Sequence, residues 1–486
     1  MKLWELREGL FIKAFSSQGD RYANSLQVFP LSSPHPLPPI NFQFNFCEFT
    51  LDPKQELAVL VGVDPECAAS LQVHIRSTIT GLPHPLARRS LLTVKFTRSW
   101  SMVGLDIMEN ILSVKFSNNT SQTYEVLTWD WTSGVLLGRI SSNNGICDFT
   151  FLDRSHLVLY SATHDESSGD LALRSISLQI FAIPVVLEDR GDLTNAHFDP
   201  DGYPILSPVL TFELPQLHAL YSVYGESSFL VRSDPTPGRI IYVASAAFAC
   251  SHAITLGLTL TIRGTHGMYH YYRVIVSGFH LLKHLEQCKR DATTVLPWSE
   301  WGEQATRWSL ENTGPDDWIC WISGPRYVVA NHLSHPWTVS LSVVDFHTPT
   351  IRCRPSPASH DFQLSSRQSG APKCREALSD PSFSSFYPSD VHSEAASEGS
   401  SSSDNVAFAK VVDSNTPTLT TRGFKTEFFS RLPFRIVTRK RAYTTHDGWL
   451  INGNHIIGVE PWDSQGGGFQ ASEAISIYKL RVSTIE

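Results

Sequence analysis

The segment Tyr124-Glu-Val-Leu-Thr-Trp129-Asp-Trp-Thr-Ser-Gly134 contains the pattern on which the fold prediction rests. The pattern is an apolar residue, followed by any residue and then by Val. The segment ends at Gly134, where the chain must reverse with a positive φ angle. The same beginning, with Val or Ile in third place, returns six more times along the chain. The other copies are Leu26-Gln-Val-Phe-Pro-Leu31, Leu71-Gln-Val-His-Ile75, Leu178-Gln-Ile-Phe-Ala-Ile183, Tyr272-Arg-Val-Ile-Val276, Leu341-Ser-Val-Val-Asp-Phe346 and Ile475-Ser-Ile-Tyr-Lys-Leu480.

An apolar strand precedes three of these copies. Residues 56–61, 111–116 and 156–160 lie before the second, third and fourth copies, so a strand, a turn and a patterned strand repeat as a hairpin. The first four copies start 45, 53 and 54 residues apart, close to the roughly 40 to 50 residues of a four-stranded propeller blade. Trp129-Asp-Trp131 resembles the Trp-Asp end of a WD-repeat blade. The sequence therefore predicts an all-β propeller of about seven blades, with six or eight left open.

Composition agrees with a sheet-built protein. The chain has 486 residues, 42% of them hydrophobic, with 12 Trp, 14 Tyr and 27 Phe, and aromatic side chains pack well across strands. Its 39 basic and 47 acidic residues give 39 − 47 = −8, which disfavours a nucleic-acid or acidic-membrane binder. Helical spacing is confined to one segment, residues 279–290, where Leu281, Leu282, Leu285 and Cys288 recur. This scarcity of helix disfavours a bundle or a doubly wound sheet.

No targeting or membrane segment is predicted. Residues 1–15 carry charges throughout and lack a secretory h-region, so we expect a cytoplasmic or nuclear protein. Residues 240–262 carry no formal charge, but from Leu256 they alternate as a strand does. The eight cysteines show no C-x-x-C spacing, which indicates buried free thiols rather than zinc ligands or disulfides.

A serine-rich insert divides the predicted propeller. Residues 356–405 contain 16 Ser, 4 Pro and three Leu or Val residues, too few apolar groups to offset the ordering entropy. The sequence therefore predicts propeller blades in 1–355, a disordered insert in 356–405 and closing strands of the same domain in 406–486. Ser393-Glu and Ser397-Glu admit two readings, a phosphorylation cluster and a solvated linker, of which the linker is preferred.

The common catalytic signatures are missing from the sequence. We find no G-x-S-x-G, H-E-x-x-H, phosphate-binding or dinucleotide glycine motif, so we predict no catalytic residue, no cofactor-binding residue and no cofactor. His266 and His270 are the best metal candidates, but residues four apart on a strand lie about 13 Å from each other. An aromatic and histidine surface beside Tyr269, Tyr271 and Tyr272 is the preferred reading, and no metal site is predicted.

Two further segments admit a binding role and a structural one. Residues 422–441 carry seven basic residues and one acid, interleaved with four phenylalanines; the preferred reading is a strand with charges outward and phenylalanines inward, rather than an anion or nucleic-acid site. Residues 298–321 contain five Trp. If exposed, they would suit a protein partner; otherwise they lock a loop onto the core.

Several segments resemble fungal F-box proteins that carry a C-terminal β-propeller-like region. They are Asp52-Pro-Lys-Gln-Glu-Leu-Ala-Val-Leu-Val61, Val73-His-Ile-Arg-Ser-Thr-Ile-Thr-Gly-Leu-Pro-His-Pro-Leu86, Val295-Leu-Pro-Trp-Ser-Glu-Trp-Gly302, Gly324-Pro-Arg-Tyr327 and Ser430-Arg-Leu-Pro-Phe-Arg-Ile-Val437. The resemblance extends from Trp4 to Leu480 and implies a substrate-recruiting receptor of a ubiquitin ligase. It implies no catalytic residue. Residues 6–15 read as the first propeller strand and residues 41–44 as an alternating strand, so we expect no F-box here and no direct binding of the ligase adaptor.

These observations predict a noncatalytic protein-interaction scaffold with a protein partner, related to the substrate-recognition region of F-box receptors. The alternative is a propeller-fold enzyme, hydrolase-like, with an inter-blade site. Several acids or histidines converging in the central channel would favour the enzyme, whereas a channel lined by Val, Ile and Phe would disfavour it.

Overall fold

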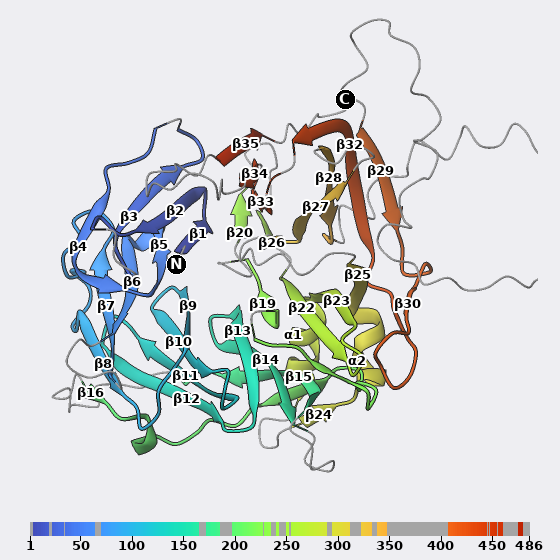
Figure 1. Cartoon of the computed structure of the whole chain (residues 1–486), viewed down its shortest axis with the longest axis horizontal. Coiled ribbons are helices and arrows are strands. Elements are labelled where there is room, and N and C mark those ends of the chain that lie inside the picture. Colours follow the sequence, from blue (N-terminus) through green and yellow to red (C-terminus); the bar gives the residue numbers. More distant parts are fainter. Residues whose placement is uncertain are drawn as a thin grey trace, which may run out of the picture.

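The fold is described from a computed structural model of the whole chain. The described residues are 3–18, 22–33, 35–63, 70–164, 172–184, 197–226, 228–234, 240–242, 249–251, 254–288, 294–311, 322–332, 338–347, 407–444, 446, 448–453, 455–459 and 475–479. In these ranges, the strands form seven sheets of three to five strands, which follow one another in chain order around a ring (Figure 1). The chain is a seven-bladed β-propeller, as the sequence predicts.

The first four blades come from the N-terminal half of the chain. Blade one contains β1 (Leu3–Arg7), β2 (Leu10–Phe15), β3 (Ala23–Pro30) and β4 (Ile40–Phe46). Blade two contains β5 (Glu48–Asp52), β6 (Leu57–Val63), β7 (Ser70–Ser77), β8 (Leu91–Lys95) and β16 (His197–Phe198), with the 3₁₀ turn η1 (Pro53–Gln55) between β5 and β6. Blade three contains β9 (Met102–Met108), β10 (Ile111–Asn118), β11 (Thr123–Asp130) and β12 (Val135–Ser142). Blade four contains β13 (Gly145–Asp153), β14 (His156–His164), β15 (Leu173–Ala182), β17 (Leu210–Glu213) and β24 (Thr294–Leu296), and η2 (Pro200–Gly202) precedes β17.

The last three blades complete the ring. Blade five contains β18 (Tyr221–Val223), β19 (Leu230–Arg232), β22 (Thr255–Gly264), β23 (Tyr269–Ser277) and β25 (Thr306–Glu311). Blade six contains β26 (Ile322–Ser323), β27 (Arg326–His332), β28 (Thr338–Asp345), β32 (Phe434–Thr444) and β29 (Ala407–Val412), and blade seven β33 (Gly448–Asn452), β34 (His455–Val459) and β35 (Ile475–Lys479). Outside the blades lie α1 (Gly278–Gln287), α2 (Trp298–Ala305) and the strand pairs β20 (Ile240–Tyr242) with β21 (Ala249–Ser251) and β30 (Thr418–Thr420) with β31 (Phe428–Ser430).

Every copy of the repeated pattern lies on the third strand of its own blade. The seven strands are β3, β7, β11, β15, β23, β28 and β35. On β11, Val126 packs in the core between blades three and four, whereas the adjacent Leu127 packs in the core between blades two and three. Because side chains alternate between the two faces of a strand, one strand serves two neighbouring cores. This explains why apolar residues occupy consecutive positions of the pattern.

The start of the chain differs from the prediction. Residues 6–15 form a hairpin of β1 and β2 rather than one strand, because Glu8 and Gly9 adopt φ angles of 47° and 82° and reverse the chain. A two-residue turn with both residues at positive φ matches the twist of a β-hairpin. The expected alternating strand at 41–44 is confirmed as part of β4.

Helices are few among the described residues, as the sequence predicts. The predicted helix is α1, and the uncharged segment 240–262 contributes β22 rather than a helix. Among the described residues, the structure has no helix that is long and apolar enough to span a membrane. The second helix, α2, was not predicted, although Pro297 before it and Glu300 in its first turn are typical of a helix start. The Ser-rich insert, with Ser393 and Ser397, lies outside the described residues.

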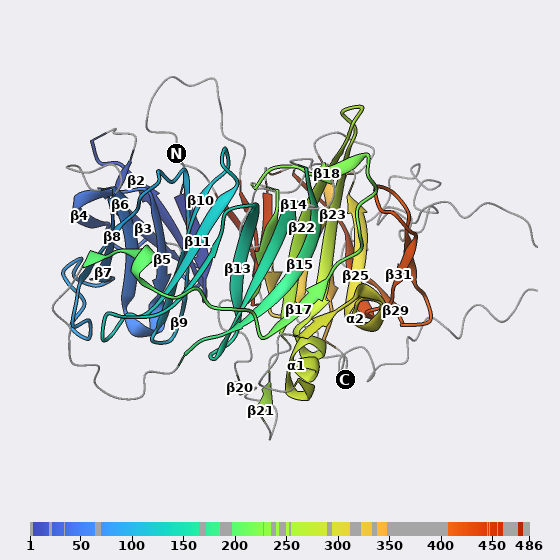
Figure 2. The same cartoon turned by 90° about the horizontal axis from the view of Figure 1, so that it is seen from below.

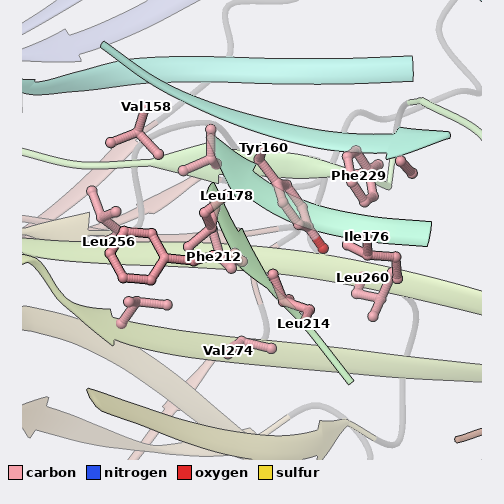
Figure 3. Close-up of a cluster of buried hydrophobic side chains, with 14 of the residues drawn as sticks. Val158, Tyr160, Ile176, Leu178, Phe212, Leu214, Phe229, Leu256, Leu260 and Val274 are labelled. Atoms are coloured by element: carbon pink, nitrogen blue, oxygen red, sulfur yellow. The ribbon is translucent and has the colours of Figure 1, made fainter. Parts of the chain in front are cut away.

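The largest apolar core lies between blades four and five (Figure 3). Tyr160 of β14 stacks on Phe229, which precedes β19, with ring centroids 3.7 Å apart. Phe212 of β17 packs edge-on against Trp301 of α2 at 4.9 Å. This core fixes β22 and β23 against blade four and so positions the hairpin that forms the candidate functional site.

Candidate functional site

An exposed cluster of aromatic and aliphatic side chains lies at one end of blade five. We call it the tyrosine surface and define it as Leu220, Tyr224, Arg263, Met268, Tyr269 and Tyr271. Leu220 and Met268 are 50% and 54% exposed, and Tyr224 and Tyr269 are 44% and 36% exposed. Figure 2 shows β18 and the end of the β22–β23 hairpin on the opposite face of the ring from α1. Exposed aromatic, methionine and arginine side chains together are the typical composition of a protein-binding surface.

The rings of the tyrosine surface are held by one another and by a cation. Tyr269 contacts Tyr224 edge-on at 4.9 Å between centroids and stacks on Tyr271 at 6.3 Å. The guanidinium carbon of Arg263 lies 5.9 Å from the Tyr224 ring and 5.8 Å from the Tyr269 ring, a cation–π geometry. These contacts limit the motion of the side chains in the free protein, so less entropy is lost on binding.

A tight turn brings these residues together. Arg263 and Tyr269 face each other across β22 and β23, and Gly267 closes the turn between them with a φ angle of 75°. The carbonyl of Leu220 accepts a hydrogen bond from the Thr265 amide at 3.0 Å, and Tyr224 donates its amide to the Thr261 carbonyl at 2.8 Å. The connection around β18 is thereby fixed to the hairpin.

A distant segment, residues 422–425, packs against the same end of blade five. The hydroxyl of Tyr272 donates to the Arg422 carbonyl at 2.8 Å, and the Lys425 amide donates to the Gln216 carbonyl at 2.9 Å. Gly423 has a φ angle of 79°, and a Cβ atom there would lie 2.0 Å from Ile262 Cδ1. Glycine is therefore required where this segment crosses β22.

The two candidate histidines lie on different parts of the β22–β23 hairpin. His266 lies in the exposed turn and His270 on β23, where its ring lies 5.7 Å from the ring of Tyr221. No group of three or more His, Cys, Asp or Glu side chains in the described ranges could hold a metal ion. The preferred reading, an aromatic and histidine surface, is what the hairpin presents.

The basic stretch 422–441 is divided among structural roles. Phe424, Phe428 and Phe434 are buried, as predicted, but Phe429 is 43% exposed, because it points away from the core on the short β31. Arg431 pairs with Glu303 of α2. The side chains of Lys440 and Arg441 lie outside the described set. The expected single strand is wrong: residues 422–427 form turns, 428–430 form β31, and only residues from Phe434 onward form the longer β32.

The tryptophan-rich segment is mostly buried. Trp301 and Trp308 are 4% and 1% exposed, and Trp298 packs edge-on against both of them. These three residues lock α2 onto blade five, which is the structural one of the two readings. Trp318 and Trp321 lie outside the described residues.

Hydrogen bonds between different blades hold the ring together. Leu51 of β5 donates its amide to Glu5 of β1, which joins blades two and one. Arg7 of β1 donates to the Ile107 carbonyl of β9 at 2.7 Å, which joins blade one to blade three. Four further hydrogen bonds each join two neighbouring blades. Thr150 donates to Asp106 between blades four and three, and the Val231 amide donates to Asp148 between blades five and four. The Gly324 amide donates to Asp234 between blades six and five, and the Gly453 amide donates to Ser323 between blades seven and six. Sequence patterns did not identify this polar belt.

One ammonium group connects three blades. Lys115 of β10 extends its Nζ to Asp148 at 3.2 Å and to Glu226 at 2.8 Å, and Asp148 also pairs with Arg232. Although burial opposes the charge, Arg232 and Lys115 hold the pKa of Asp148 below its ordinary value. Acids therefore do converge near the centre of the ring, which was the criterion favouring an enzyme. Among the described contacts, Asp148 pairs with Lys115 and Arg232, and Glu226 pairs with Lys115.

Glu48 lies in the same region and has a strongly raised pKa. Burial raises the pKa of Glu48 to about 8, and the nearby Glu5 contributes in the same direction. The folded state therefore holds a proton that the unfolded chain releases near its ordinary value of 4.5.

We expect the protein to lose stability as the pH rises from about 5 to about 8, because the folded state keeps a proton on Glu48 that the unfolded chain has already released. Between about pH 5.5 and about pH 8.5 the loss should be on the order of 3 kcal/mol, since each pKa unit corresponds to about 1.4 kcal/mol. Glu48→Gln should remove this loss, measured by urea unfolding at both values. The control Glu286→Gln, at an exposed position of α1, should follow the wild type. Parallel pH profiles for wild type and Glu48→Gln would contradict the assignment.

Comparison with known proteins gives a fold likeness only. No protein-family model and no curated protein matches the sequence. The WD40 domain of SCAP from fission yeast is 10% identical with a TM-score of 0.32, covering 71% of this chain and 70% of that one. The complex of KlAtg21 with the coiled coil of AgAtg16 is 10% identical with a TM-score of 0.24, covering 57% and 79%. TM-scores this low carry no argument, and the propeller fold is established by the order of the strands in the seven sheets.

Proposed function

We propose that this chain is a noncatalytic protein-interaction scaffold. The observation that carries the proposal is the tyrosine surface, where four large apolar side chains remain exposed around an ordered arginine. Such side chains contribute strongly to binding when a partner removes them from water. The rigid ring beneath them holds the surface in one geometry, so a partner does not have to order it.

A finer proposal concerns the class of scaffold. The sequence resemblance to F-box proteins supports a substrate-recognition role in ubiquitin-ligase receptors. One solved structure of similar fold, KlAtg21, is described in complex with a coiled coil. That is a property of the other protein, and at a TM-score of 0.24 it carries no argument for this chain.

The enzyme alternative has one observation in its favour. A carboxyl group whose pKa is raised to about 8, as in Glu48, can act as a general acid near neutral pH. Against it, Asp148 of the central cluster is saturated by Lys115, Arg232 and the Val231 amide. Glu226 Oε2 has no hydrogen-bond partner, but this carboxylate is buried and its other oxygen is held by Lys115 and Ser117. We therefore favour the scaffold.

Affinity purification of the full chain from its own cells tests the scaffold. We expect a protein partner to be recovered at a fixed stoichiometry and to survive washing at physiological salt. Tyr224→Ala should reduce the recovery more than Leu82→Ala, whose side chain is 64% exposed on the β7–β8 connection of blade two. Recovery of no partner, together with turnover of a hydrolase substrate that depends on Glu48, would support the enzyme instead.

A further inference from the structure

Basic side chains surround the tyrosine surface. Arg263 lies on it, and Arg422 and Lys425 are exposed on the segment that packs beside it. The Arg174 guanidinium donates its Nε to the Tyr221 carbonyl at 3.3 Å, which brings a further positive charge under β18. The chain as a whole has a net charge of −8, so this local excess of positive charge is a specific feature of blade five.

Besides Glu226, which is buried and paired with Lys115 at 2.8 Å, two described acids lie near this region. Glu311, opposite Tyr271 across β23 and β25, is engaged by Arg273 at 3.5 Å. Glu427 is exposed two residues beyond Lys425, next to the buried Phe428. Neither residue belongs to the tyrosine surface, whose one formal charge is that of Arg263. The surface therefore attracts an acidic ligand over a neutral or basic one.

The apolar members of the surface indicate the class of macromolecule. Leu220 and Met268 are the two most exposed apolar side chains of the set. Methionine and leucine adapt to apolar side chains of a peptide, whereas single-stranded nucleic acid is bound mainly by aromatic stacking and phosphate contacts. The guanidinium of Arg263 is a planar fork suited to a carboxylate, and its contacts with Tyr224 and Tyr269 orient it in advance.

We propose that the tyrosine surface binds an acidic peptide segment of a partner protein, in which aliphatic or aromatic side chains alternate with Asp and Glu. The proposal rests on the scaffold function and specifies its ligand. The carboxylates meet Arg263, Arg422 and Lys425, and the apolar side chains cover Leu220 and Met268. The aromatic contacts between Tyr224, Tyr269 and Tyr271 remain intact beneath the peptide.

Selection from a phage-displayed random peptide library on the full chain provides a defined probe. We expect the enriched peptides to be rich in Asp and Glu with interspersed apolar residues, and to bind more weakly as salt is added. Arg263→Ala and Tyr269→Ala should each weaken the Kd of a synthesised peptide by about tenfold or more, measured by fluorescence anisotropy. The control Leu82→Ala should leave the Kd unchanged. Unchanged thermal unfolding of each variant separates lost contacts from lost folding.

Several outcomes would overturn the proposal. Enrichment of neutral or basic peptides would do so, as would binding that is insensitive to Arg263→Ala and Tyr269→Ala. Tighter binding of oligothymidylate, or of vesicles made of equal parts phosphatidylcholine and phosphatidylserine, would assign the surface to another class of ligand. Tighter binding of a peptide with the sequence of residues 376–405, which has six acids and no Lys or Arg, would make the chain's own insert the occupant.

Failure of this proposal is distinguishable from failure of the scaffold function. If a cellular partner is recovered equally by wild type and Arg263→Ala, the scaffold function stands and the tyrosine surface is not its site. If no cellular partner is recovered although acidic peptides bind with the expected sensitivity to Arg263, the surface proposal stands and the scaffold function is contradicted.

Discussion

Lys115→Met should lower the free energy of unfolding by about 3 to 5 kcal/mol, the usual loss when one partner of a buried ion pair is removed. The substitution keeps the length of the apolar stem but removes the ammonium that joins Asp148 and Glu226. Asp148 keeps Arg232 as a partner, whereas Glu226 keeps only the hydroxyl of Ser117, at 2.7 Å, among its described contacts. The loss should be visible in urea unfolding at neutral pH.

A second substitution tests whether the uncompensated charge causes this loss. Glu226→Gln in the Lys115→Met background should recover about 1 kcal/mol or more, because the neutral amide needs no counter-ion. Lys95→Met, at the exposed end of β8, is the matched control and should change the stability by less than about 0.5 kcal/mol. Equal effects of Lys115→Met and Lys95→Met would show that the central ion cluster does not stabilise the ring.

Ile457→Ala should open the junction at which the ring closes. Ile457 and Leu450 of blade seven are fully buried, and they pack with Leu6, Phe11 and Leu31 of blade one. Removing three methyl or methylene groups from such a site costs about 2 to 5 kcal/mol, since the cavity cannot collapse completely. Hydrogen exchange should show earlier loss of protection in β1, β33 and β34 than in β13 and β14, because the break lies at the junction.

Ile477→Ala provides the control in the same blade. Ile477 lies on β35 and is 39% exposed, so its truncation should cost less than about 1 kcal/mol. If Ile457→Ala reduced protection uniformly around all seven blades, the junction would not be the weak point of the ring. If the two substitutions had equal effects, the closure would not depend on this apolar cluster.

The blade repeat could be predicted from sequence because it is a local pattern. Val126 and Leu127 point to opposite faces of one strand, and both faces are buried by neighbouring blades, so adjacent apolar residues recur wherever a third strand occurs. The turn at Glu8 and Gly9 was missed because its first residue is a glutamate, which seldom adopts a positive φ angle.

The candidate site could be predicted only in part. The hairpin with Tyr269 and Tyr271 was expected to present an aromatic surface, because its residues are close in sequence. Leu220 and Tyr224 come from a connection some 45 residues earlier, and no spacing rule joins them to the hairpin. The polar belt was missed for the same reason: its acids, such as Glu5, Asp106, Asp148 and Asp234, are far apart in sequence, and only the closed ring brings them together.

Blade six also shows how the polypeptide could be divided without dividing the propeller. β28 and β32 are adjacent strands that pair from Thr338 with Thr444 to Asp345 with Arg435. In the chain they are separated by residues 348–406, which lie outside the described residues, and by β29, which pairs with the other edge of β32. A protein produced as two fragments, residues 1–347 and 407–486, should reassemble along this seam. Fusing a candidate binding protein to either fragment would turn blade six into a split reporter, with regained folding as its signal.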